Sequence, residues 1–107
     1  MPKYLFRGSY SQEGIKGVKK EGVSARMDVA RALAEGLGGK LEAFYFAFGA
    51  HDFYAIADLP DNAAAVALAT TVGASGAMSA FETTPLLTPE EANEAARRSV
   101  NYRPPGA

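Results

Sequence analysis

The sequence contains no cysteine and no tryptophan, and it has a single histidine. Without thiols the chain has no disulfide, no zinc–thiolate centre and no cysteine nucleophile. A transition-metal site needs about three protein ligands, which a lone histidine does not supply, so we expect no metal. The patterns GxGxxG, GxxxxGK[ST] and GxSxG are also missing. We therefore expect no nucleotide cofactor, no serine-hydrolase elbow and no cofactor of other kinds.

The sequence also lacks a surplus of positive charge and a long apolar run. Its 11 basic and 12 acidic residues give a net charge of −1, and the basic residues are scattered. Nucleic-acid binders usually gather several cations on one face, so we expect no nucleic-acid partner. No apolar stretch approaches the roughly 20 residues of a membrane span, and residues 1–4 lack the layout of a signal peptide. These features predict a cytoplasmic protein without a membrane partner.

A chain of 107 residues is expected to form one domain. A chain of this size buries roughly two-thirds of its unfolded surface, which is enough for a single core. We place the domain at residues 1–100. Residues 101–107 (NYRPPGA) contain two prolines and a glycine and are predicted to form an extended tail.

Periodicity and capping signals predict alternating strands and helices. Ser11 and Asp61 are expected N-caps, and Thr88, Pro89 and Glu91 form the pattern of a capping box with proline in the first turn. The predicted strands are 3–10, 40–48, 53–58 and 77–84, with a tight turn at 49–52, and the predicted helices are 12–20, about 24–37, 62–73 and 89–100.

Two of these helices carry a prediction about burial. The second is expected to bury a stripe of apolar residues at spacings of four and three, with Arg26 off the stripe. The third, which is alanine-rich and uncharged, is expected to be covered on all sides. The stripe consists of Val23, Met27, Ala30, Ala34 and Leu37.

The order strand, helix, strand, strand, helix, strand, helix is that of an α+β, ferredoxin-like βαββαβ fold with an added C-terminal helix. It implies a four-stranded sheet of antiparallel type, in which the first and third strands are central. We expect these two strands to be parallel, joined by a right-handed crossover. The second and fourth strands should form the edges.

Residues 40–58 hold six of the eleven aromatic residues and the only histidine. Strict alternation places Phe44, Phe46 and Phe48 on one face of the sheet and Leu41, Ala43, Tyr45 and Ala47 on the other. Helices cover only one face in this fold, so a sheet that is apolar on both faces needs a second cover. We therefore predict a homo-oligomer, with a two-fold dimer that packs sheet against sheet as the expected form.

Five segments resemble the GYD domain family, and together they extend over nearly the whole chain. They are residues 4–6 (YLF), 11–17 (SQEGIKG), 38–49 (GGKLEAFYFAFG), 58–61 (DLPD) and 84–91 (TPLLTPEE). The resemblance implies the fold of a dimeric α/β barrel, assembled from two ferredoxin-like chains. It assigns no activity, because function depends on the site rather than on the fold.

The sequence departs from the Gly-Tyr-Asp signature that names the family. Gly49 and Asp52 match the first and last positions, but His51 stands where the tyrosine is expected and Ala50 intervenes. A role that needs a phenol at this position is therefore not carried over. Related dimeric α/β barrels include cofactor-independent monooxygenases and lactone isomerases, which make enzymatic activity one of the implied alternatives.

His51 and Asp52 are the candidate catalytic residues. Histidine is the side chain whose ordinary pKa lies closest to neutrality, so an acid–base role is one interpretation. The alternative is that both residues shape the turn of the hairpin, where Asp52 accepts backbone hydrogen bonds. Neighbouring strand residues point to opposite faces, which favours the second interpretation.

The candidate ligand-binding residues are Arg7, Tyr4, Tyr45 and Tyr54. Tyrosines that line an apolar cavity can hold a small apolar or aromatic ligand, and Arg7 can bind an anionic group. The alternatives are that the tyrosines are core and interface residues and that Arg7 pairs with Glu42 or Glu82.

Three functions follow from these observations. We expect an oligomeric protein that binds a small molecule in an apolar, tyrosine-lined cavity. A cofactor-independent monooxygenase or isomerase is the first alternative, and a structural assembly module is the second.

Overall fold

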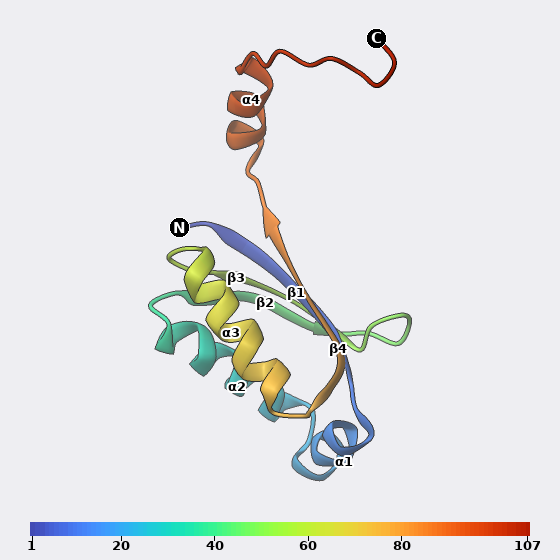
Figure 1. The fold of residues 1–107 in the computed structure, drawn as a ribbon. Helices are drawn as coiled ribbons and strands as arrows, with labels where there is room; N and C mark the ends of the chain where they lie inside the picture. Colours follow the sequence, from blue (N-terminus) through green and yellow to red (C-terminus); the bar gives the residue numbers. More distant parts are fainter.

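The computed structural model describes residues 1–107 and has an α+β, ferredoxin-like arrangement (Figure 1). A four-stranded antiparallel sheet, in the order β2-β3-β1-β4, carries two long helices on one side. The elements are β1 (Lys3–Tyr10), α1 (Gln12–Glu21), α2 (Ser24–Gly36), β2 (Lys40–Phe46), β3 (Phe53–Asp58), α3 (Asn62–Ala74), β4 (Met78–Leu86) and α4 (Pro89–Arg97).

The two central strands are antiparallel, so the prediction of a parallel central pair was wrong. In β1, Lys3 lies opposite Asp58 of β3 and opposite Leu86 of β4, and both pairings are antiparallel. The crossover through α1 and α2 does make β2 run parallel to β1. The hairpin then reverses the chain and inserts β3 between them, so the two parallel strands are not neighbours.

Strand β1 alternates between the two faces of the sheet. Tyr4, Phe6, Gly8 and Tyr10 are buried, and the residues between them are half-buried on the opposite face. Helices α2 and α3 cover the buried face and complete the main core (Figure 1). That core consists of Tyr4, Phe6, Ala34, Ala55, Ala57, Leu59, Ala65 and Leu68.

A bulge changes the predicted faces of β2. The register with β3 shifts between Leu41 and Ala43, so that Leu41 pairs with Ala57 while Ala43 pairs with Ile56. The extra residue rotates Leu41 onto the helix-covered face, where it packs against the core together with Phe44. Strict alternation had placed Leu41 and Phe44 on opposite faces.

Residues 47–52 form a loop between β2 and β3 rather than a tight turn within two longer strands. The amide of Ala47 donates to the carbonyl of Asp52 at 2.8 Å and closes the loop at its base. The loop projects from the domain, and the side chain of Phe48 is fully exposed instead of continuing the row of Phe44 and Phe46.

The buried face of α2 contains part of the predicted stripe. Val23 and Met27 are exposed, whereas Ala34 and Leu37 pack on the core as predicted, together with Leu33, which the stripe did not include. Helix α3 is also less covered than its composition predicted, because Val66 on its outer side is 62% exposed. None of the four helices has both the length and the apolar character that crossing a bilayer requires.

The predicted helix starts are confirmed. Ser11 accepts a hydrogen bond from the amide of Gly14 and Asp61 from that of Ala64. Thr88 heads a complete capping box.

Helix α4 ends at Arg97, somewhat earlier than predicted, and residues 98–107 contain no helix or strand. Helix α4 and the residues on either side of it stand away from the domain as an arm, defined here as residues 87–107 (Figure 1).

Two glycines of α1 test how closely this helix approaches the sheet. An added Cβ at Gly14 lies 2.1 Å from the carbonyl oxygen of Ala77, whereas one at Gly17 meets nothing within 4 Å. We expect Gly17→Ala to raise the free energy of unfolding by about 0.5–1 kcal/mol, because alanine favours the helix. Gly14→Ala should lower the free energy of unfolding, because the backbone of Ala77 must move to make room for the methyl group. Urea unfolding of both variants measures the difference, and equal effects would contradict the close approach.

Candidate functional site

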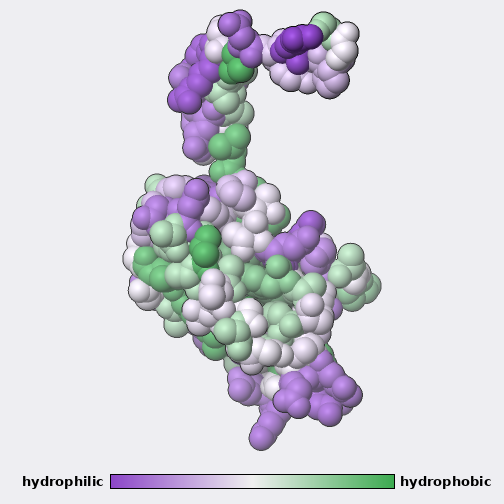
Figure 2. Space-filling view, in the orientation of Figure 1, coloured by the Kyte–Doolittle hydropathy of each residue, from purple (hydrophilic) through white to green (hydrophobic).

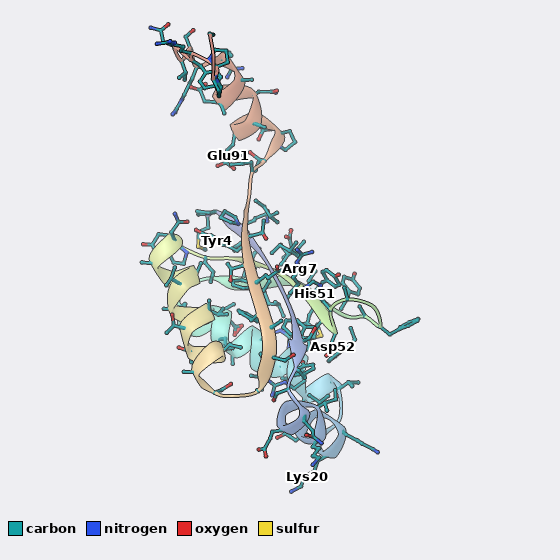
Figure 3. All side chains as sticks on the ribbon, turned by 45° about the vertical axis from the view of Figure 1, so that its right-hand side comes forward. Tyr4, Arg7, Lys20, His51, Asp52 and Glu91 are labelled. Carbon is teal, nitrogen blue, oxygen red and sulfur yellow. The ribbon has the colours of Figure 1, made fainter.

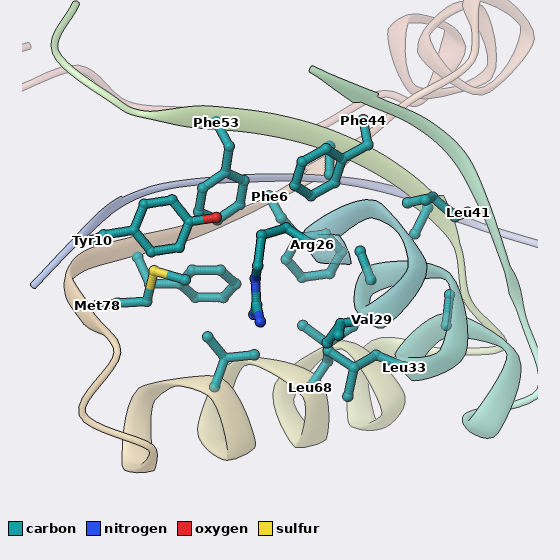
Figure 4. Close-up of a pocket in the computed structure, with 16 residues that line it drawn as sticks. Phe6, Tyr10, Arg26, Val29, Leu33, Leu41, Phe44, Phe53, Leu68 and Met78 are labelled. Carbon is teal, nitrogen blue, oxygen red and sulfur yellow. The ribbon is translucent and has the colours of Figure 1, made fainter. Parts of the chain in front are cut away.

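An apolar cavity of about 60 Å³ lies between the sheet and helices α2 and α3 (Figure 4). It is partly open, and all but one of its 16 lining residues are hydrophobic. The strands contribute aromatic rings, and the helices contribute aliphatic side chains, among them Val29, Leu33 and Leu68. Small-molecule sites are usually apolar cavities with a few polar groups, and this cavity has that character at a smaller size than most.

The wall formed by the sheet is built from interlocking aromatic rings. The rings of Phe44 and Phe53 stack with centroids 5.6 Å apart and an interplanar angle of 2°. Tyr10 packs on Phe53 at 5.6 Å, and Phe6 stacks on Phe81 at 5.9 Å. Aromatic pairs at these distances stabilise one another beyond their burial, so the wall is preformed rather than adaptable.

Two polar groups face this cavity, the guanidinium of Arg26 and the hydroxyl of Tyr10 (Figure 4). Burial raises the pKa of the Tyr10 phenol, because the phenolate loses its hydration. The nearby Arg26 opposes the shift, and the charge of Asp52 adds to it. Arg26 was not among the predicted site residues. The sequence does contain a signal for Arg26. Arg26, Ala30 and Ala34 follow one another at intervals of four, so they share one face of α2, and this is the face toward the sheet.

The predicted ligand-binding residue Tyr4 lies in the core outside this cavity. Its hydroxyl donates to Oδ1 of Asn62 at 2.6 Å, which satisfies the buried polar group. Tyr4 instead borders a second, more polar cleft of about 370 Å³ near Pro60, Pro85 and Glu91, at the base of the arm.

Arg7, His51 and Tyr54 meet on the face of the sheet that no helix covers. Nε of Arg7 donates to Oε2 of Glu82, and Nε2 of His51 lies 3.2 Å from the same oxygen. The ring of His51 meets that of Tyr54 edge-on, with centroids 5.9 Å apart. Figure 3 shows Arg7 and His51 side by side, away from α2 and α3. The Arg7–Glu82 pair is one of the two pairings expected from the sequence.

His51 and Asp52 do not act on a common point. Oδ2 of Asp52 accepts a hydrogen bond from the amide of Tyr10 at 2.9 Å, and the amide of Asp52 donates to the carbonyl of Gly8. The side chain of His51 is directed to Glu82 instead, with Nδ1 buried and without a partner. These contacts support the interpretation that Asp52 holds the hairpin loop against β1.

Tyr45 and Tyr54 also lie on the open face. They are paired across β2 and β3, and Tyr45 is 71% exposed. Thus none of the four predicted ligand-binding residues lines the apolar cavity, and the tyrosine that does so is Tyr10. No three histidine, cysteine, aspartate or glutamate side chains are grouped so that they could hold a metal ion.

The residues of the cavity and of the open face all lie in a segment that matches a known protein family. The family model described as the GYD domain matches residues 4–96, from the start of β1 to the last turn of α4. The chain belongs to the GYD domain family. Comparison with the curated proteins and with the solved structures gave no match. Both the apolar cavity and the open face therefore lie within the GYD domain, and their roles must be argued from its own residues.

The raised pKa of Tyr10 gives this GYD domain a specific pH dependence. The folded protein keeps the Tyr10 proton at a pH where the unfolded chain has lost it. The resulting stability is fully present below pH ~10, the ordinary pKa of tyrosine, and is lost as the pH rises above it. Chemical unfolding between about pH 8 and pH 11 should therefore show wild type losing stability relative to Tyr10→Phe.

The exposed Tyr102 of the arm provides the matched control for this measurement. The difference in free energy of unfolding between wild type and Tyr102→Phe should stay constant over the same pH range. If the difference in free energy of unfolding between wild type and Tyr10→Phe stays constant as well, burial does not control the ionisation of Tyr10.

Proposed function

We propose that this GYD domain is an oligomeric protein that binds a small molecule in the apolar cavity between the sheet and helices α2 and α3. The observation that supports binding is the cavity itself, which has a preformed aromatic wall and two polar groups. Buried apolar walls supply affinity, and a few polar groups orient the ligand.

The same geometry gives less support to the enzymatic alternative. The lining of the cavity contains no histidine and no carboxylate, and the raised pKa of the Tyr10 phenol leaves little phenolate to act as a general base near neutral pH. The acid–base groups of the chain that do meet, His51 and Glu82, lie on the opposite face of the sheet. A cofactor-independent monooxygenase or isomerase would need such a group at the substrate. A purely structural module, the second alternative, would not need a cavity.

A substitution that fills the cavity tests the proposal. Ala30 lines the cavity from α2, whereas Ala32 on the same helix is exposed. We expect a panel of small aliphatic acids, aromatic acids and lactones to include compounds that raise the melting temperature of wild type and of Ala32→Leu, because a ligand that binds only the folded state stabilises it. Ala30→Leu should remain folded and lose this response. A ligand response that survives Ala30→Leu places the ligand elsewhere, and no response from any variant contradicts the proposal.

The open face of the sheet supports the proposed self-association. Leu5, Tyr54 and Ile56 are half-buried there, and Tyr45 is mostly exposed. The charges on this face are already paired within the chain, because Lys3 binds Asp58 and Glu42 and Arg7 binds Glu82. A second copy can therefore pack on the central part of the face without burying these charges unpaired, while Lys40 at the end of β2, which has no salt bridge, stays at the margin. Sheet-against-sheet packing in a two-fold dimer meets this requirement with identical surfaces.

The arm supplies an independent reason to expect a second copy. Helix α4 has only nine residues and none of them is buried. Isolated helices shorter than about 12–15 residues are marginal in water, so α4 needs a surface to pack on. Its own domain does not provide one (Figure 1). Figure 2 shows hydrophobic colour at the base of the arm and at the tip of the loop between β2 and β3.

The oligomer can be tested by substitution of one apolar residue on each side of the molecule. Ile56 lies on the open face, and Val66 is exposed on the outer side of α3. We expect light scattering at micromolar concentration to give at least twice the 11.2 kDa of one chain for wild type and for Val66→Lys. Ile56→Lys should give a folded monomer, because a charge cannot be buried unpaired. A wild-type monomer contradicts the proposed assembly.

A further inference from the structure

Arg26 is the one charged residue in the lining of the apolar cavity. It lies in the first turn of α2 and its side chain extends between the aromatic wall of the sheet and the aliphatic side chains of the helices (Figure 4). A guanidinium remains charged at all ordinary pH values. The cavity therefore contains a permanent positive charge in apolar surroundings.

No side chain of the protein neutralises this charge. The chain has seven salt bridges and Arg26 takes part in none of them. The carboxylate of Asp52, which is the acidic group near Tyr10, binds the amide of Tyr10 and lies beyond salt-bridge distance of Arg26. A half-buried cation without an anionic partner is costly, and a ligand that brings the anion removes that cost.

The hydroxyl of Tyr10 adds a second donor at the same end of the cavity. It points toward the side chain of Arg26, and its phenol is protonated near neutral pH, as for any tyrosine with an ordinary or raised pKa. The planar guanidinium matches the two oxygens of a carboxylate, and a neutral phenol can donate one more hydrogen bond. A phosphate dianion fits less well, since one guanidinium leaves part of its charge uncompensated.

The remaining lining defines the rest of the ligand. The volume of about 60 Å³ is less than half of the roughly 150 Å³ cavity that is known to hold benzene. The enclosed part therefore suits an unbranched hydrocarbon chain, which is narrower than a ring and can extend through the open side of the cavity. We propose that the ligand is a short-chain aliphatic monocarboxylate, with its carboxylate on Arg26 and Tyr10 and its chain between Phe6, Phe44 and Leu68. This assignment rests on the proposed function of the same cavity.

Paired acids and amides test the assignment, because they have nearly the same size and differ in charge. Calorimetric titration of the full chain with hexanoate and with hexanamide should give tighter binding of the acid by about tenfold or more, the range expected of a charge-assisted hydrogen bond. Arg26→Gln should abolish this preference and leave binding of the amide unchanged. Tyr10→Phe should weaken binding of hexanoate by a smaller factor.

Arg31 provides the matched control. It lies on the same helix and pairs with Asp28 at the surface, so Arg31→Gln should bind hexanoate as wild type does. If Arg31→Gln and Arg26→Gln lose the same amount of affinity for hexanoate, the acid is attracted to the whole surface of the helix, and the assignment is overturned. Thermal unfolding of each variant in the absence of ligand checks that it is folded.

The outcomes separate this inference from the proposed function. Equal binding of hexanoate and hexanamide by wild type, abolished by Ala30→Leu, keeps the cavity as a binding site and overturns the carboxylate assignment. Undiminished binding of hexanoate by Arg26→Gln also overturns the carboxylate assignment. If neither compound binds to wild type and the wider screen of acids and lactones also gives no response, both the assignment and the proposed function are wrong.

Discussion

The close packing around the central strand β1 is the constraint on which the rest of the structure depends. This strand pairs with β3 on one side and β4 on the other, and every second side chain of it is buried beneath the helices. At Gly8 the backbone comes so near its neighbours that an added Cβ would lie 2.7 Å from the carbonyl oxygen of Ala80 and 3.2 Å from the ring of Phe53. The absence of a side chain there leaves room for the aromatic rings that form the wall of the cavity.

The sheet separates the chemistry of the protein into two parts. The helix-covered face holds the apolar cavity, in which Arg26 and Tyr10 are the polar groups. The opposite face holds the cluster of Arg7, His51 and Glu82 together with exposed aromatic residues. Side chains on opposite faces of a strand cannot meet at one ligand. The two faces therefore serve different purposes, which we propose to be ligand binding and self-association.

Most of the secondary structure was predictable because its signals are local. Helix starts depend on one capping side chain and the next few amides, and all three expected caps are present at Ser11, Asp61 and Thr88. The alternation of β1 was also readable, since successive side chains of a strand point to opposite faces. The βαββαβ pattern predicted which strands are central and which form the edges, and the sheet has that order; the family match over residues 4–96 confirms the GYD resemblance.

The candidate site was less predictable because it depends on contacts between distant segments. Periodicity alone could not decide which face of α2 meets the sheet, so Arg26 was placed off the buried stripe although it faces the cavity. Alternation alone could not reveal the bulge that turns Leu41 toward the core. His51 was singled out for its chemistry, but its neighbour Glu82 comes from β4, and only the folded sheet brings the two together.

The sequence by itself thus determined the elements, their caps, the family and the absence of thiol chemistry, because each of these depends on residue type or on spacing within a few residues. The tertiary structure decided which side chains share a space. It placed Arg26 and Tyr10 in the cavity and Arg7, His51 and Tyr54 outside it. The physical reason is that burial and pairing depend on which surfaces pack together, and that is settled by the whole core rather than by any one segment.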